Sequence, residues 1–182
     1  LATYGGPFNR VTKKPFNDFG GEISYTGGSW NYNRFTVDVN TPVNASKTVL
    51  FRLNGATTFQ KSFQDLGFKN NVTVAPSLSY QITDRLSILF DIEYGREKGT
   101  SVVRFNPFLK SNKIQSIADM NFPYNKLFGS NDMPYETEMM NIFTQMNYKI
   151  SDQWASQTVF SRARSTIDGY TTAITGMSDT TA

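Results

Sequence analysis

Two carboxylates spaced two residues apart, Asp91 and Glu93, are the side chains of this sequence most able to do chemistry. Alternate residues of a β-strand point to the same side, so the pair has the arrangement of a general acid and base. The interpretation we favour is that each carboxylate pairs with a cation on a neighbouring segment. The sequence has no histidine and no cysteine, which removes Ser-His-Asp and Cys-His catalysis and the ordinary zinc sites. We therefore expect neither an enzyme nor a resident cofactor or metal.

A second group of candidate site residues is aromatic and lies between Gly95 and Met139, where no strand-like pattern is seen. Aromatic faces and an arginine can hold a bulky, partly apolar ligand. The same rings would alternatively pack the loop against itself, since a loop of about 45 residues needs a small core of its own. The group comprises Arg104, Phe105, Phe108, Phe122, Tyr124, Phe128 and Tyr135.

The segments that must position these residues alternate strictly between apolar and polar side chains. Every even-numbered residue is apolar from Val72 to Ile82 and again from Leu86 to Tyr94. Runs of about 9–11 residues have the length that a tilted strand needs to cross a bilayer. No stretch approaches the roughly 18 consecutive apolar residues of a membrane helix. Lipid is therefore the expected cover for the apolar side of these strands.

Seven strands are predicted by this alternation. They cover Gly21–Gly27, Arg34–Asn40, Val49–Phe59, Val72–Ile82, Leu86–Tyr94, Asn141–Ile150 and Trp154–Arg162. Their connections alternate between short ones, at Thr41–Thr48, Thr83-Asp84 and Ser151-Asp152, and long ones, at Gln60–Asn71 and Gly95–Met139. Outer-membrane barrels have short turns on one side and longer loops on the other.

Aromatic residues on the apolar face gather at both ends of the strands, as the two interfaces of a membrane require. Phe19, Tyr80, Tyr148 and Trp154 lie toward the short turns, and Tyr25, Phe59 and Tyr94 lie toward the long loops. The opposite face carries charges of both signs, which suits a water-filled lumen or a polar plug. A soluble β-sandwich also alternates but has no need of these aromatic ends.

Charge is spread along the chain rather than concentrated. The sequence has 18 basic and 15 acidic residues, a net charge of +3. Nucleic-acid binding is disfavoured, because it requires a concentrated basic stripe. Seven strands do not close a barrel of the even-numbered bacterial kind. Since the sequence also begins at Leu1 without a leader, we expect it to be an internal piece of a longer protein.

Residues 5–15, Gly-Gly-Pro-Phe-Asn-Arg-Val-Thr-Lys-Lys-Pro, resemble the end of the plug in TonB-dependent siderophore receptors. In that family a Gly-Gly pair, an apolar pair, Asn and Val-Thr-Lys-Lys-Pro precede the first barrel strand; Pro7-Phe8 departs from the commoner aliphatic pair. The resemblance extends to about residue 165. It includes Gly28–Asn31 as the first outer hairpin, Leu50–Ala56 as the third strand, Phe122-Pro123 with Phe128-Gly129 and Tyr135 as the returning limb of the third outer loop, and Ile150–Trp154 as a periplasmic turn.

This resemblance implies an all-β fold, an antiparallel transmembrane β-barrel of 22 strands filled by an N-terminal plug. Residues 1–17 would be the C-terminal end of the plug and residues 18–182 the N-terminal part of the barrel. Lys13 and Lys14 would form ion pairs that fix the register where plug meets barrel. The last dozen residues match no part of the family.

The resemblance also implies a function. The intact protein would lie in the outer membrane of a Gram-negative bacterium, in contact with its lipid, and take up ferric siderophores or similar scarce nutrients. TonB would drive uptake through plug residues outside this chain. The outer-loop residues expected to bind ligand are Arg104, Phe105, Tyr124, Phe128 and Tyr135, with Arg104-Phe105 and Tyr135 best placed by family position. The alternatives are a passive porin-like or adhesion barrel and a soluble β-sandwich binding module, with an enzyme last.

Overall fold

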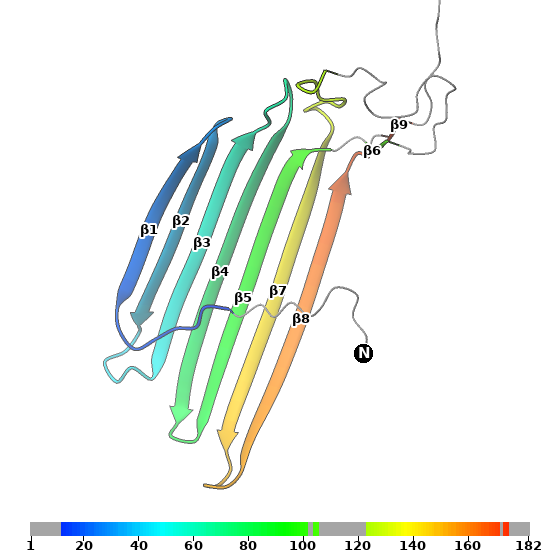
Figure 1. Cartoon of the computed structure of the whole chain (residues 1–182). Helices are drawn as coiled ribbons and strands as arrows, with labels where there is room; N and C mark the ends of the chain where they lie inside the picture. The colour runs from blue at the N-terminus through cyan, green and yellow to red at the C-terminus, as the bar shows by residue number, and fades with distance from the viewer. Residues whose placement is uncertain (1–11, 102–103, 106–122, 172, 175–182) are drawn as a thin grey trace, which may run out of the picture.

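A computed structural model describes residues 12–101, 104–105, 123–171 and 173–174. Within them, seven strands form one sheet in which every strand pairs antiparallel with its neighbour in the chain (Figure 1). The strands are β1 (Gly20–Gly28), β2 (Tyr32–Pro42), β3 (Val49–Lys61), β4 (Phe68–Thr83), β5 (Leu86–Thr100), β7 (Pro134–Lys149) and β8 (Ala155–Gly169). Two short strands, β6 (Arg104–Phe105) and β9 (Ala173–Ile174), pair in parallel beyond the end of this sheet.

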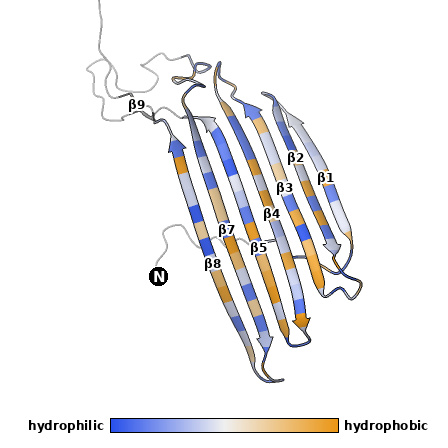
Figure 2. Ribbon diagram, turned by 180° about the vertical axis from the view of Figure 1, so that it is seen from behind, coloured by the Kyte–Doolittle hydropathy of each residue, from blue (hydrophilic) through white to orange (hydrophobic). Residues whose placement is uncertain are grey.

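The register of the sheet gathers the predicted apolar residues on one face, and Figure 2 shows apolar and polar residues alternating along the strands. Tyr80 lies opposite Ile88, and Ile88 lies opposite Met146. On the other face, Ser77 lies opposite Asp91. A shift of one residue in any pair would put charges among the apolar side chains, so the period-2 pattern fixes the register.

The apolar face has no protein cover within the described residues. Leu50 and Leu89 are the buried hydrophobic residues of this part of the chain, whereas Ile23 and Trp154 are 82% and 70% exposed. The soluble β-sandwich alternative requires a second sheet over this face, and the described residues supply none. Among these residues no helix is long and apolar enough to cross a membrane. The sheet has instead a polar interior face and an open apolar one.

Strands β5 and β7 are longer than predicted. β5 continues past Tyr94 to Thr100, and β7 begins at Pro134, so the predicted loop from Gly95 to Met139 was too long at both ends. Beyond Tyr94 the outward-facing residues are charged, and the apolar alternation that marks a strand stops. Cross-strand ion pairs replace it, because Arg96 Nη2 lies 2.6 Å from Glu136 Oε1. The β3–β4 connection is likewise shorter than predicted, residues 62–67, and β8 extends to Gly169.

The first outer hairpin is as tight as predicted. Trp30 and Asn31 have φ angles of 55° and 57°, which is the left-handed pair that a type I′ turn requires. The Tyr32 amide closes the turn by donating to the Ser29 carbonyl at 3.2 Å. Asparagine tolerates this conformation better than most residues, but tryptophan does not, so the turn presents the Trp30 ring at some conformational cost.

Candidate functional site

The segment of residues 12–18 crosses the polar face of the sheet from β5 back to the start of β1 (Figure 1). At one end, Thr12 Oγ1 donates to Asp91 Oδ2 of β5 at 3.0 Å. At the other, the Phe16 amide donates to Asn40 Oδ1 of β2 at 3.0 Å, and Asn40 Nδ2 donates to the carbonyls of Phe16 and Asp18 at 2.8 and 2.6 Å. Asn40 is 1% exposed. It satisfies three backbone groups of this segment, which has no regular secondary structure to satisfy them.

An ionic cluster holds the middle of the segment. Asp38 of β2 lies between Lys13 Nζ at 2.8 Å and Arg52 of β3, which donates from Nε at 2.9 Å and from Nη2 at 2.8 Å. Arg52 also donates from Nη1 to the Lys14 carbonyl at 2.9 Å and stacks its guanidinium 5.3 Å from the centre of the Phe16 ring. The predicted ion pair is present for Lys13. One arginine thus binds sheet and segment at once.

Of the two candidate catalytic carboxylates, Asp91 is bound to neutral groups. Asp91 accepts hydrogen bonds from the hydroxyls of Thr12 and Ser77, and Glu93 accepts one from Asn141 Nδ2 at 3.4 Å. The expectation of a cation partner was wrong for Asp91, because hydroxyls take that place within the described residues. Asp91 is 5% exposed, so its contacts fix the position of Thr12 rather than present a free base to solvent.

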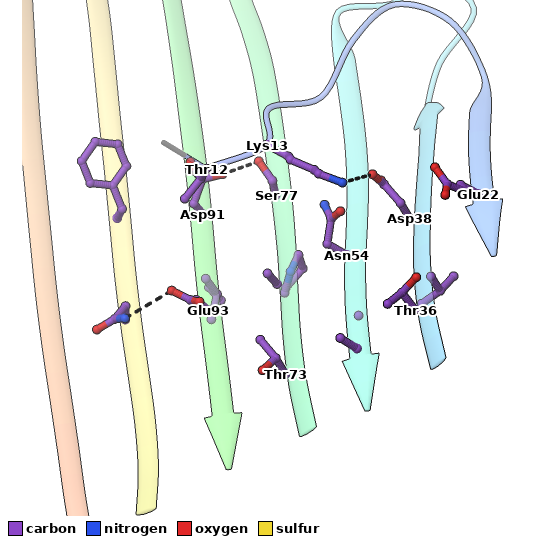
Figure 3. A pocket seen from close by; sticks show the side chains of 18 of the residues that line it. Thr12, Lys13, Glu22, Thr36, Asp38, Asn54, Thr73, Ser77, Asp91 and Glu93 are labelled. Atoms are coloured by element: carbon purple, nitrogen blue, oxygen red, sulfur yellow. Dashed lines mark hydrogen bonds and ion pairs between the residues drawn. The ribbon is translucent and has the colours of Figure 1, made fainter. Parts of the chain in front are cut away.

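Between this segment and the sheet lies an open hollow of about 470 Å³ (Figure 3). Its lining combines apolar residues with polar ones and is mixed in charge, with Lys13, Glu22, Arg34, Asp38, Asp91 and Glu93 as the ionisable residues. Among the described residues, no three carboxylates come close enough to hold a metal ion. The charges of both signs in this lining suit a further polar segment of chain or a hydrated solute.

At the opposite end of the strands, the loop of residues 62–67 is hydrogen-bonded to residues 123–133. The Asp65 amide donates to the Asn125 carbonyl at 2.8 Å, and Asp65 Oδ1 accepts from the Leu127 amide at 2.9 Å. Gln64 Nε2 donates to the Lys126 carbonyl at 3.0 Å. Two loops that are far apart in sequence thus form one unit, which we call the loop pair.

Asn131 anchors the loop pair to the top of the sheet. Its Oδ1 accepts from the Gly67 amide at 2.9 Å and from Thr100 Oγ1 at 2.8 Å, and Thr100 Oγ1 in turn accepts from the Phe68 amide at 3.1 Å. Gly67 has a φ of 111° and a position where an added Cβ would lie 2.9 Å from Ser62, so glycine is required at this bend. β4 and β5 therefore carry the loop pair as a fixed attachment.

The five residues predicted to bind ligand are divided between this region and the strands. Tyr124, 83% exposed, and Phe128 both lie in the loop pair. Arg104 and Phe105 form β6, which pairs with β9 in the part of the chain that the sequence left unassigned. The remaining rings of the predicted group, Phe108 and Phe122, lie outside the described residues.

Tyr135, predicted as a loop residue, lies instead in β7. Its hydroxyl donates to Glu97 Oε1 at 2.7 Å, and Lys69 Nζ lies 3.0 Å from Glu97 Oε2. Burial and the hydrogen bond to Glu97 raise the pKa of Tyr135 to about 12. Burial raises the pKa of Glu97, but the hydrogen bonds from Tyr135 and Lys69 outweigh it and leave that pKa below its ordinary value. Tyr135 thus has a structural contact through its hydroxyl.

Sequence reasoning missed Asn40, Asp65 and Asn131. Each is a polar residue among many, and each acts through contacts with segments at least 22 residues away. The one available signal was at Asn40, which continues the polar face of its strand just before Pro42. A solvated asparagine would have given the same pattern.

One face of the sheet is polar and binds an N-terminal segment, and the other is apolar and bounded by aromatic rings. These two features define a segment of β-barrel wall. The chain superposes on the ferripyoverdine receptor of the outer membrane of Pseudomonas aeruginosa with a TM-score of 0.68 and 18% identity, over 83% of this chain and 20% of that one. It superposes on the ferric-catecholate import receptor Fiu of E. coli with a TM-score of 0.71 and 18% identity, over 87% of this chain and 23% of that one. For the alcaligin outer-membrane receptor FauA of Bordetella pertussis the TM-score is 0.62 and the identity 17%, over 85% of this chain and 21% of that one. At these identities the likeness establishes the fold.

The sequence itself is 28% identical over 167 residues to the metal-pseudopaline receptor CntO of Pseudomonas aeruginosa, covering 91% of this chain and 23% of that protein. No family model matches the chain. The predicted resemblance to TonB-dependent siderophore receptors is confirmed by these relatives, and the predicted outer-membrane location agrees with them. The chain spans under a quarter of the length of the curated relatives that it matches.

Proposed function

We propose that this chain is the plug exit and the first part of the barrel wall of an outer-membrane receptor that imports a metal chelate, a ferric siderophore or a compound like it. Residues 1–17 would end the plug, and residues 18–182 would begin a barrel of 22 strands. TonB would act on plug residues outside this chain. The role is transport, without catalysis or a resident cofactor.

The observation that carries this proposal is the position of residues 12–18 on the polar face. A chain entering the first strand from inside a barrel must cross the lumenal surface, and here it does so through Asn40, Asp38 and Asp91. Among the described residues nothing covers the apolar face, and large hydrophobic side chains are exposed along it. These two facts assign one face to the lumen and the other to lipid.

A passive porin-like or adhesion barrel is the second candidate. Such a barrel needs no N-terminal segment across its lumen, whereas an ionic cluster and a buried asparagine bind one here. The segment therefore favours a plugged, energy-dependent receptor over an open pore.

The ligand would be bound on the outer side by the loop pair and its surroundings. Tyr124, Phe128 and Tyr135 would contribute aromatic contacts, and Arg104 and Phe105 are the further residues proposed to bind ligand. The hydrogen bonds of Asp65 and Asn131 support this proposal, because they attach the loop that carries the exposed Tyr124 ring to the sheet, and a ring held in position loses less entropy on binding.

The test is uptake by whole cells. The full-length protein is expressed in a strain that lacks other receptors for the compound, and cells are given a panel of ⁵⁵Fe-loaded siderophores and other labelled metal chelates. We expect saturable uptake of at least one chelate that stops when TonB is deleted. Uptake that is linear in concentration and indifferent to TonB would establish the porin alternative.

A further inference from the structure

The lipid-facing side of β8 carries two arginines among apolar neighbours. The register places Arg162 opposite Ile142 and Arg164 opposite Met140, and both β7 partners belong to the apolar face. Phe160, 59% exposed, precedes them on the same side of β8. Both arginines are exposed, and neither forms an ion pair within the described part of the chain.

The position of the pair along the strand is the outer edge of the apolar belt. Arg162 and Arg164 lie eight and ten residues from Trp154, the aromatic residue at the short-turn end. A strand tilted by about 40° rises about 2.5 Å per residue along the membrane normal, which puts them about 20 and 25 Å above Trp154, in a belt about 25 Å tall. Met140 lies opposite Arg164. On this side of β7, the next residue toward the long loops is the charged Glu138.

The acidic residues of β7 at this level already have partners, and Asp168 of β8 lies four residues beyond Arg164, about 13 Å along the strand. Arg96 lies 2.6 Å from Glu136, and Glu138 receives the Tyr94 hydroxyl at 3.3 Å and lies 3.8 Å from Arg96. Within the part of the chain that the structure describes, the two arginines of β8 therefore have no paired counter-charge at the rim. A guanidinium among hydrocarbon chains is unfavourable, so its stem extends toward the head groups.

We propose that Arg162 and Arg164 bind the phosphate of a lipid head group in the outer leaflet. Residues i and i+2 of a strand lie about 6.6 Å apart on one side, a spacing that lets two planar guanidinium groups contact one phosphate from both sides. This site is separate from ligand uptake and rests on the proposal that the apolar face meets lipid. It assigns a specific lipid contact to the wall of the barrel.

The experiment measures lipid retained by the full-length receptor after purification in mild detergent, by native mass spectrometry. The variant is Arg162→Gln with Arg164→Gln. The matched control is Arg85→Gln, which removes the same charge from an exposed arginine at the short β4–β5 turn, the opposite interface. We expect loss of phosphate-bearing lipid by about fivefold for each arginine removed, no loss in the control, and an intermediate loss when both arginines become lysine.

Two further measurements distinguish bound lipid from free phosphate, and lipid binding from barrel assembly. Phosphatidic acid added back should occupy the wild type but not the double variant, whereas inorganic phosphate should not displace the bound lipid. Heat-modifiable migration in gels reports barrel assembly independently of lipid, and the single variants serve if the double variant does not assemble. Equal lipid retention by the wild type and the assembled arginine variants would overturn the proposal and assign the pair to acidic side chains of the next strand. Failure of the wild type to insert in a membrane would instead refute the proposed function.

Discussion

Arg52 binds Asp38 in a bidentate manner, donating from Nε to Oδ1 at 2.9 Å and from Nη2 to Oδ2 at 2.8 Å, while its Nη1 donates to the Lys14 carbonyl. The pair joins β2 to β3 and both strands to the segment above them. Asp38→Asn would leave Arg52 and Lys13 without their shared counter-charge. We expect a loss of about 1.5–3 kcal/mol in the free energy that holds the segment in place, seen as faster trypsin cleavage after Lys13 in the full-length receptor; the bond after Lys14 precedes Pro15 and resists trypsin.

The control for this change is Asp84→Asn, at an exposed position of the β4–β5 turn. That variant should be cleaved at the wild-type rate. Equal cleavage of Asp38→Asn and the wild type would mean that the ionic cluster does not hold the segment.

Asn40→Ala tests the other anchor. The change leaves the Phe16 amide and the carbonyls of Phe16 and Asp18 without partners in a site that is 1% exposed. Each unsatisfied buried group costs about 1–3 kcal/mol, so hydrogen exchange at residues 16–18 should accelerate by at least tenfold. Asn40→Asp keeps the acceptor but loses both donors, so its exchange rate should lie between those of the wild type and Asn40→Ala. Unchanged exchange in both variants would mean that Asn40 does not hold the segment.

The lipid assignment is tested by two adjacent substitutions in β5. Ile88→Arg places a charge on the apolar face near mid-strand and should hinder assembly by about 2–4 kcal/mol. Ser87→Arg faces the lumen, near Asn147, and should be far milder. Heat-modifiable gel migration of the full-length protein distinguishes them. Equal tolerance of the two arginines would reverse the inside and the outside of the wall.

The loop pair should be necessary for tight ligand binding. Asp65→Ala removes the acceptor for the Leu127 amide, which loosens the loop pair by about 0.5–1.5 kcal/mol, equivalent to about two- to tenfold in affinity. The measurement is the half-saturating concentration for uptake of the transported chelate. Asp132→Ala is the matched control, since the hydrogen bonds of Asp132 are local to its own turn. If Asp65→Ala and this control had the same half-saturating concentration, the loop pair would have no part in ligand binding.

The contact between Tyr135 and Glu97 predicts a pH dependence. Because the pKa of Glu97 in the folded protein lies below its ordinary value of 4.5, its contribution to stability is fully present above pH 4.5 and is lost as the pH falls through the lowered pKa. Tyr135→Phe removes a donor to that carboxylate and should shift the pKa of Glu97 upward. Carboxyl titration by ¹³C NMR in detergent micelles measures both values, and an unshifted pKa in the variant would contradict the contact.

The parts of this structure that follow from local pattern were predictable, and those that follow from distant contacts were not. The faces of Ser87 and Ile88 were visible because strands repeat every two residues. The extension of β5 to Thr100 was not, because Arg96 and Glu136 show no alternation and their ion pair joins residues 40 positions apart. The loop pair was hidden for the same reason: Asp65 meets Leu127 across 62 residues.

The attachments of residues 12–18 lie one after another along the segment, at Thr12 to β5, Lys13 to β2, Lys14 to β3, and Phe16 and Asp18 to β2. A tension applied from the amino-terminal side would therefore load the Thr12 hydroxyl first and reach Asn40 last. Attachments arranged in series along a chain break one at a time under such a load. The force needed to lift the segment is set by its strongest single attachment, and not by the sum of them all.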